Sequence, residues 1–274
     1  MKPRSPIRRS ASRLLLQIYT AAVFAFIFMP LVTIAVFSFN ADRFPSLPWA
    51  GFSLTWYQAV FADPTIARGL SNSLIVAAAI AIISTLLGIG AAYVDYRYRF
   101  VGKGIYTALM TLPPTIPVVI LGLAMLTFEG RIGITGTLSG IVAGHVVLCM
   151  PFALALVRLR LADLDPNLEA ASWNLGATRW TTMRDVIIPF CRPAIIAALF
   201  LTAAISFDEF MIAWFISGLN ETLPVRLLAM LQGQVSPRIN AVGTMVFSVS
   251  IGLVVLAQLV IGRRLRMRAA GLER

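Results

Sequence analysis

The chain has 274 residues, of which 58% are hydrophobic and 13% charged, and its mean hydropathy is +0.83. A soluble domain would carry about 25% charged residues, so this composition excludes an ordinary soluble protein and indicates a membrane protein. A net charge of +11 could suggest a nucleic-acid partner. The basic residues flank long apolar segments, however, which favours a topological role for the charge and no nucleic-acid binding.

Six apolar segments are each long enough to cross a bilayer as a helix. They cover residues 14–37, 70–94, 105–128, 138–157, 194–218 and 241–261. A helix of about 20 residues spans a hydrocarbon core of about 30 Å. The first segment follows a basic leader, as a signal peptide would, but its apolar run exceeds the usual length of about 7–15 residues. We therefore expect an uncleaved first helix.

The basic residues predict the orientation of these helices. Of the 23 lysines and arginines, 18 lie in the leader, in the loops after the second and fourth segments, and in the tail. The positive-inside rule then places both termini in the cytoplasm. The sequence thus predicts an all-α integral membrane protein with six transmembrane helices.

Several residues within the segments have a predicted structural role. Pro113, Pro114 and Pro117 interrupt the third segment, which indicates either a broken helix beside a transport path or an ordinary kink. His145 has no second histidine or cysteine close by, so a hydrogen bond to a neighbouring helix is favoured over a metal site. The two cysteines, Cys149 and Cys191, predict no disulfide framework.

The cytoplasmic loop 158–193 has the pattern of a helix, a turn and a second helix. Asp165 suits an N-cap, and Gly176 suits the left-handed residue that ends a helix. Thr178 can cap a second helix, which we expect to stop at Pro189. The small alanines of the first helix could form a flat docking face. The alternative is an amphipathic connector on the membrane surface.

This loop resembles the EAA loop of binding-protein-dependent ABC importer permeases. The matching residues are Glu169, Ala170, Ala171, Gly176, Ile187 and Pro189, with Ile188 where the family pattern often has leucine. The resemblance covers most of the chain and implies the type I ABC importer permease fold. It also implies that Glu169, Ala170, Ala171, Gly176 and Pro189 couple the chain to an ATP-hydrolysing subunit.

The resemblance implies a division of labour between subunits. This chain has no GxxxxGK[ST] phosphate loop, so we expect no enzymatic activity and no cofactor on it. ATP and Mg would bind a partner ATPase dimer. The other implied partners are a second permease subunit, which the resemblance favours as a paralogue, and a periplasmic or extracellular solute-binding protein. Membrane lipid would surround the complex in the bacterial cytoplasmic membrane.

The expected organisation has three parts. Residues 1–65 would hold the leader, the first helix and an external loop. Residues 66–261 would form the importer transmembrane domain, including the coupling loop 158–193. Residues 262–274 would form a basic cytoplasmic tail.

Two adjacent acids, Asp208 and Glu209, lie inside the apolar run of the fifth segment. A charge at such a position costs about 2.5–3.5 kcal/mol, so these residues are candidates for a solute path. Nearby Phe207, Phe210 and Trp214 could add cation–π attraction for an ammonium group. The alternatives are carboxylates satisfied by Ser, Asn or His within the bundle, and aromatic rings that simply pack.

Residues 206–244 resemble the corresponding part of spermidine/putrescine-type permeases. The shared features are the acidic pair, Thr222-Leu223-Pro224, Val235-Ser236-Pro237 and Asn240-Ala241. This resemblance implies a cationic solute such as putrescine or spermidine, although the same subfamily also serves other solutes.

Two other protein classes remain as alternatives. A proton- or cation-coupled secondary transporter could use Asp208 and Glu209, but it would leave the EAA residues unexplained. A membrane enzyme would need paired metal ligands or a serine nucleophile with a local histidine, and the sequence indicates neither.

Overall fold

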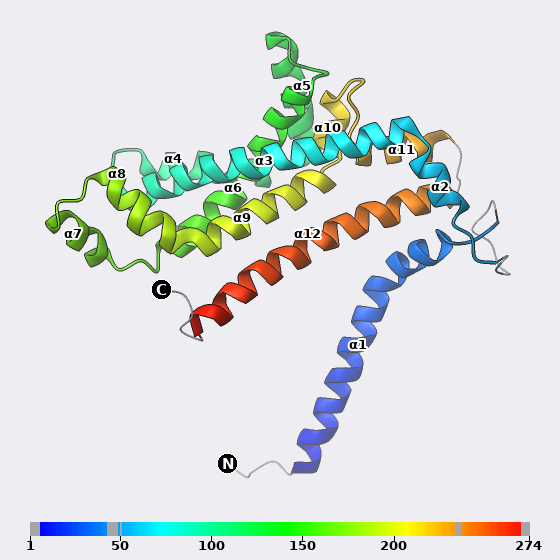
Figure 1. Cartoon of the computed structure of the whole chain (residues 1–274), viewed down its shortest axis with the longest axis horizontal. Coiled ribbons are helices and arrows are strands. Elements are labelled where there is room, and N and C mark those ends of the chain that lie inside the picture. Colours follow the sequence, from blue (N-terminus) through cyan, green and yellow to red (C-terminus); the bar gives the residue numbers. More distant parts are fainter. Residues whose placement is uncertain (1–5, 43–48, 50, 234–236, 270–274) are drawn as a thin grey trace. The chain divides into compact units, whose positions relative to one another are not determined.

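The computed structural model describes residues 6–42, 49, 51–233 and 237–269, and these are almost entirely helical (Figure 1). The elements are α1 (Pro6–Phe37), α2 (Thr55–Phe61), α3 (Pro64–Arg97), α4 (Lys103–Thr111), η1 (Pro113–Thr115), α5 (Val118–Ile132), α6 (Leu138–Leu161), α7 (Pro166–Asn174), α8 (Arg179–Thr182), η2 (Met183–Ile187), α9 (Ile188–Asp208), α10 (Met211–Ile216), α11 (Leu223–Gly233) and α12 (Pro237–Ala269). The predicted residues Val235 and Ser236, and parts of the leader and tail, lie outside the described residues.

Five helical stretches of the described chain are long and apolar enough to cross a membrane. They cover Arg13–Phe37, Pro64–Arg97, Leu138–Leu161, Arg179–Asp208 and Pro237–Leu256. They match the predicted first, second, fourth, fifth and sixth segments, so the all-α membrane fold is confirmed. The predicted third segment is divided between α4, η1 and α5.

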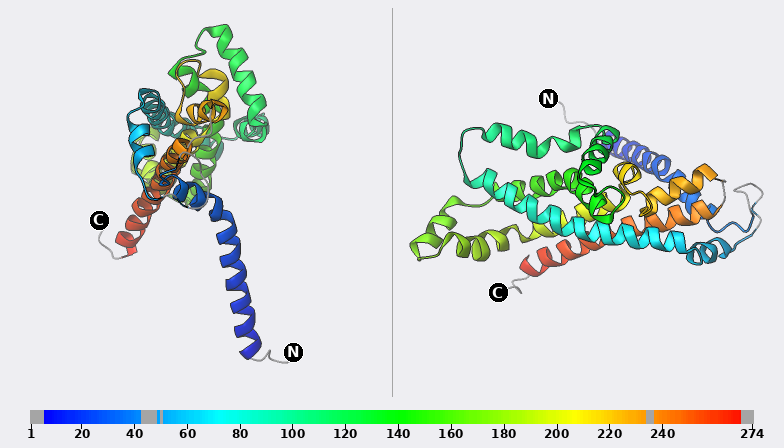
Figure 2. Two further views of the ribbon diagram at one scale, coloured as in Figure 1. Left: turned by 90° about the vertical axis from the view of Figure 1, so that its right-hand side faces the viewer. Right: turned by 90° about the horizontal axis from the view of Figure 1, so that it is seen from above.

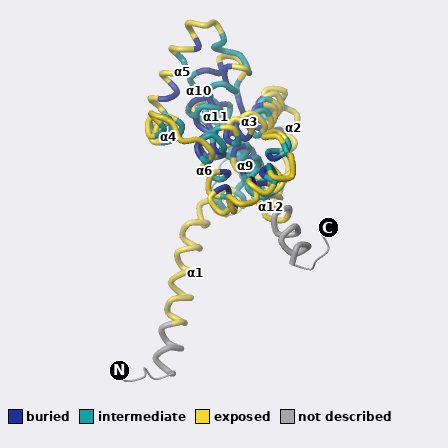
Figure 3. The backbone as a smooth tube through the Cα atoms, turned by 90° about the vertical axis from the view of Figure 1, so that its left-hand side faces the viewer, coloured by how far each residue is buried: buried dark blue, intermediate teal, exposed yellow. Residues whose placement is uncertain are grey.

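The chain forms two compact units, one of residues 1–63 with 230–245 and one of residues 64–229 with 246–274. In the first unit, no described residue of α1 from residue 13 onward is buried (Figure 3). The external connection that follows is held by polar contacts. Trp56 Nε1 donates to the carbonyl of Asn40 at 2.7 Å, and Arg238 forms an ion pair with Asp63.

The second unit is built on α3, α6 and α9, which pack side by side (Figure 2). A glycine allows the close approach of α3 to α6. A methyl group added to Gly88 would lie 2.7 Å from Ala153 Cβ and 2.8 Å from the backbone nitrogen of Leu154. The buried residues one turn away from Gly88 on α3 are the polar Ser84 and the apolar Ala92, both completely buried.

The prolines of the third segment break its helix completely. Pro113 and Pro114 begin a single 3-10 turn, and Ile116 (ψ 133°) and Pro117 (ψ 125°) are extended before α5 begins. Proline lacks the N–H that would continue the ladder, and it disfavours helical backbone in the residue before it. The structure therefore shows a broken helix and not an ordinary kink.

Two predicted helix ends were wrong. The fifth segment is not one helix over residues 194–218, because α9 ends at Asp208, Glu209 is extended (ψ 122°), and a short α10 follows. The second helix of the cytoplasmic loop does not stop at Pro189 either. The π turn η2 precedes Pro189 and lets the helix continue through it into α9. A π turn accommodates a residue that the regular i−4 ladder cannot hold.

Candidate functional site

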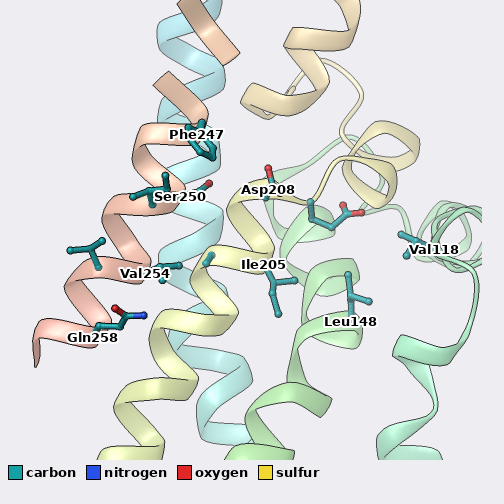
Figure 4. Close-up of a pocket in the computed structure, with 12 residues that line it drawn as sticks. Val118, Leu148, Ile205, Asp208, Phe247, Ser250, Val254 and Gln258 are labelled. Carbon is teal, nitrogen blue, oxygen red and sulfur yellow. The ribbon is translucent and has the colours of Figure 1, made fainter. Parts of the chain in front are cut away.

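A cavity of about 610 Å³ lies beside the end of α9 (Figure 4). Its walls come from the start of α5, from α6, from the last turn of α9 and from one face of α12. Asp208 and Glu209 are the charged residues of the lining, which is otherwise mostly apolar. The volume lies within the range of about 300–1,000 Å³ that is usual for small-molecule sites.

The Glu209 carboxylate stabilises the break between α9 and α10. It is only 9% exposed, and it accepts hydrogen bonds from the backbone N–H groups of Met211 (2.9 Å), Ile212 (3.0 Å) and Ala213 (3.3 Å). His145 Nε2 lies 3.1 Å from the same carboxylate. Because N–H groups at a helix start lack partners within the helix, this carboxylate satisfies them.

His145 links α6 to both sides of this break. Its Nδ1 lies 3.0 Å from Ser206 Oγ on α9, while its Nε2 faces Glu209. The predicted hydrogen bond to a neighbouring helix is therefore confirmed. Ser206, His145 and Glu209 form a line of three polar groups, but His145 is 0% and Ser206 is 3% exposed. No substrate carbonyl can reach a serine enclosed in this way, so the arrangement positions the helix break.

Asp208, one residue earlier, has the opposite environment. Its side chain is exposed and reaches the cavity, and no described residue donates a hydrogen bond to it (Figure 4). The described lining contains no lysine or arginine that could neutralise it. Asp208 is thus a carboxylate that is available to a cation.

The three aromatic candidates do not line the cavity. Phe207 is completely buried in the core. Phe210 and Trp214 stack on each other with ring centroids 6.2 Å apart, and Trp214 also contacts Phe215 at 5.0 Å. The cavity itself therefore offers no described ring of these three for a cation–π contact.

Sequence reasoning missed two polar residues of the lining, Ser250 and Gln258 on α12. They follow one face of that helix with Val254 between them (Figure 4). Their spacing of eight residues corresponds to about 12 Å along a helix. The available signal was the regular spacing of four residues among Ser250, Val254 and Gln258 within an apolar run.

A second candidate region is helix α7 of the loop 158–193, whose local structure follows the prediction. The Asp165 side chain accepts from Asn167 N at 2.9 Å and caps α7. Gly176 has φ +83° and ends that helix, and Thr178 caps α8 by accepting from Thr181 N at 3.2 Å. The expected helix, glycine turn and second helix are therefore present.

The residues of the EAA pattern point in different directions. Ala170, Ala171, Gly176 and Pro189 are exposed, as a docking surface requires. Glu169 is only 4% exposed and lies 3.1 Å from Arg97 Nε at the end of α3. Burial raises the pKa of Glu169, while the neighbouring guanidinium lowers it. Arg97 also lies 4.8 Å over the ring of Trp173, so it holds α7 against α3 through two residues.

The same end of α3 carries a second ion-pair group. Asp95 is 5% exposed and lies 2.8 Å from Arg158 Nε on α6. Thr107 Oγ1 on α4 donates to Asp95 at 3.0 Å, and Lys103 forms a further ion pair with it. The cytoplasmic end of α3 is therefore tied to α4, α6 and α7.

Several solved structures with a similar fold are transporters. The chain superimposes with a TM-score of 0.76 on a bacterial ABC transporter involved in the import of the acidic polysaccharide alginate, at 16% identity, covering 94% of this chain and 97% of that one. An amino acid ABC transporter gives a TM-score of 0.59 at 18% identity and covers 76% of this chain and 98% of that one. These likenesses show that the fold is that of a type I ABC importer permease.

Sequence comparison identifies relatives over most of the chain. The spermidine/putrescine transport system permease protein PotC of Haemophilus influenzae is 31% identical over 239 residues, which are 87% of this chain and 93% of that protein. The putrescine transport system permease protein PotI of Escherichia coli K12 is 31% identical over 258 residues, 91% of this chain and 90% of that protein. Residues 84–267 match the family of binding-protein-dependent transport system inner membrane components. This chain belongs to that family and is a transport permease subunit with several membrane-spanning helices.

Proposed function

We propose that this chain is the permease subunit of an ATP-driven importer for a small cationic solute, a polyamine such as putrescine or spermidine. The observation that carries the proposal is the unpaired Asp208 carboxylate in a cavity without a described basic residue. A carboxylate inside a membrane segment is expensive unless it serves a path or a partner. The similarity to PotC and PotI, whose names specify spermidine and putrescine, supports the same solute class.

The family and the exposed surface of α7 support the surrounding assembly that we propose. An ATPase dimer that binds ATP and Mg would dock on Ala170, Ala171 and Gly176, with Glu169 holding that surface in place through Arg97. A second permease subunit, a paralogue, would complete the path. A solute-binding protein would deliver the solute, as the alginate transporter in complex with its periplasmic protein illustrates. The location would be the bacterial inner membrane.

Transport would proceed by alternating access. ATP binding would close the ATPase dimer and favour one of two permease conformations by its differential affinity for them. Asp208 would interact with the ammonium group as the solute passes the end of α9, while Ser250 and Gln258 would offer hydrogen bonds along α12. The solute would not react during transport. This chain would therefore need only to place a negative charge beside the path and to exclude other solutes.

The test is ATP-driven uptake of labelled putrescine and spermidine into proteoliposomes containing the complete complex, its binding protein and internal ATP. Asp208→Asn removes the charge at nearly constant shape and should abolish most uptake with the complex intact. Glu221→Gln is the matched control, because Glu221 pairs with Arg226 and does not line the cavity. Uptake of neither amine by the wild type would refute the polyamine assignment. Unchanged uptake by Asp208→Asn would refute the role of Asp208.

A further inference from the structure

The carboxyl group of Glu129 is enclosed and has no partner. Glu129 lies in the last turn of α5 and is 0% exposed. Neither Oε1 nor Oε2 accepts a hydrogen bond, and no arginine, lysine or histidine of the described chain forms an ion pair with it. Buried carboxylates without donors are rare, because a buried charge normally needs both a counter-charge and hydrogen bonds.

Two glycines one turn apart on α6 make room for this carboxyl group. A methyl group added to Gly140 would lie 2.6 Å from Glu129 Oε2 and 2.7 Å from the carbonyl oxygen of Ile134. One added to Gly144 would lie 3.8 Å from Glu129 Oε1 but also 2.8 Å from Ile212 and 2.9 Å from Ile216 of α10. The carboxyl group therefore occupies a small space between α5, α6 and α10 whose walls are largely apolar.

The polar neighbour beside Gly140 is an acceptor and not a donor. A carbonyl oxygen repels a carboxylate but not a neutral, protonated carboxyl group, and this carbonyl already accepts from Thr137 Oγ1 at 2.6 Å and from Thr137 N at 3.3 Å. Because this chain encloses Glu129 by itself, a partner subunit cannot supply a cation while the packing of α5 against α10 persists. We infer that Glu129 is a proton-binding site and that its carboxyl group carries a proton in this conformation.

The charged and titratable groups of the adjoining elements are engaged elsewhere. On α6, His145 faces Ser206 and Glu209. The Glu209 carboxylate in turn accepts a hydrogen bond from Ile212 N–H at the start of α10. On α5 itself, Arg131 is exposed. The first turn of α6 would favour an anion through its dipole. However, Gly140 N donates to Thr137 Oγ1 at 3.1 Å and Ile141 N to the carbonyl of Thr137 at 3.2 Å, and no N–H of this turn donates to Glu129.

Proton binding at Glu129 would favour one arrangement of α5 and α10. The proton can be lost only when these helices separate enough for water or a donor to reach the carboxyl group. Loss of the proton at high pH therefore favours the separated arrangement, and low pH favours the packed one. This inference concerns the packing of the helices and holds whatever solute is transported.

Infrared spectroscopy of the purified full-length complex tests the inference directly. At neutral pH the wild type should show the C=O stretching band of a protonated carboxyl group, and Glu129→Gln should lose it. Glu221→Gln, which changes an external acid paired with Arg226, should retain it. Absence of the band in the wild type, or its persistence in Glu129→Gln, would overturn the inference. If the variant does not assemble, absence of the band in the wild type still overturns the inference.

Thermal stability as a function of pH gives a second readout. The apparent melting temperature of the wild type should fall between mildly acid and mildly alkaline pH, because ionisation of Glu129 opposes the packed arrangement. Glu129→Gln resembles the protonated acid at every pH and should remove at least half of that fall. An unchanged pH dependence in the variant would contradict the inference. Polyamine uptake is measured separately, so failure of the solute assignment leaves this result unaffected.

Discussion

Replacing Glu209 by Gln should destabilise the protein far more than replacing its neighbour Asp208 by Asn. Both changes remove one negative charge at nearly constant size, and the two residues are adjacent. Glu209 accepts from the N–H groups of Ile212 and Ala213 and faces His145 at 3.1 Å, whereas no described residue donates to Asp208. The comparison therefore isolates the environment of each acid from its position along the chain.

The magnitude follows from the contacts that glutamine cannot keep. One of its side-chain atoms is an NH₂ group, which cannot accept a hydrogen bond from a helix N–H. Leaving a buried N–H group without its acceptor costs about 1–3 kcal/mol. For chains of this size that corresponds to a fall of about 5 °C in melting temperature. Asp208→Asn removes no hydrogen bond of the described structure and should change stability by about 0.5 kcal/mol or less.

The assay is the apparent melting temperature of the purified complex, followed by its elution as a single assembled species after heating. Glu209→Ala serves as the larger perturbation, because it removes every acceptor at the start of α10. Equal melting temperatures for Glu209→Gln and Asp208→Asn would refute the assignment of Glu209 to the helix break. A loss of stability only in Asp208→Asn would reverse the roles given to the two acids.

Three further predictions concern the helix contacts. Gly88→Ala should destabilise the complex by about 1–3 kcal/mol, since its methyl group would meet Ala153 at 2.7 Å. Thermal melting should show no such loss for Gly90→Ala, which meets nothing within 4 Å. Arg97→Ala and Glu169→Gln should each lower the uptake per ATP hydrolysed by roughly 2- to 30-fold, which corresponds to about 0.5–2 kcal/mol of coupling free energy. An unchanged ratio of uptake to hydrolysis would show that Arg97 has no role in coupling. Gly176→Pro should uncouple hydrolysis from uptake with membrane insertion intact, and normal uptake would argue against docking at this turn.

Local chemistry made much of this architecture predictable. The apolar segments, the cap at Asp165, the left-handed Gly176 and the cap at Thr178 depend on residues within a few positions of one another. The break at Pro113–Pro117 is similarly a local consequence of missing N–H groups. Such features are encoded in short stretches, so a single sequence specifies them.

The features that the sequence alone did not predict depend on distant or compensating contacts. The end of α9 at Asp208 relies on His145, which is 0% exposed on another helix and approaches Glu209 only in the folded chain. The helix continues through Pro189 because a π turn precedes it, and the amino-acid composition does not predict that turn. The inward direction of Glu169 likewise requires Arg97 at the end of α3.

The end of α3 at Arg97 gives a physical route from α7, the helix proposed to dock on the ATPase, to the cavity. Arg97 joins it to α7, and two residues earlier Asp95 joins it to Arg158 on α6 and to Thr107 on α4. The broken segment then leads from α4 to Val118, which lines the cavity. A displacement of α7 therefore cannot occur independently of α3 unless the ion pair between Arg97 and Glu169 breaks. Because α3 and α6 are in close contact at Gly88, the two helices should move together when α3 moves.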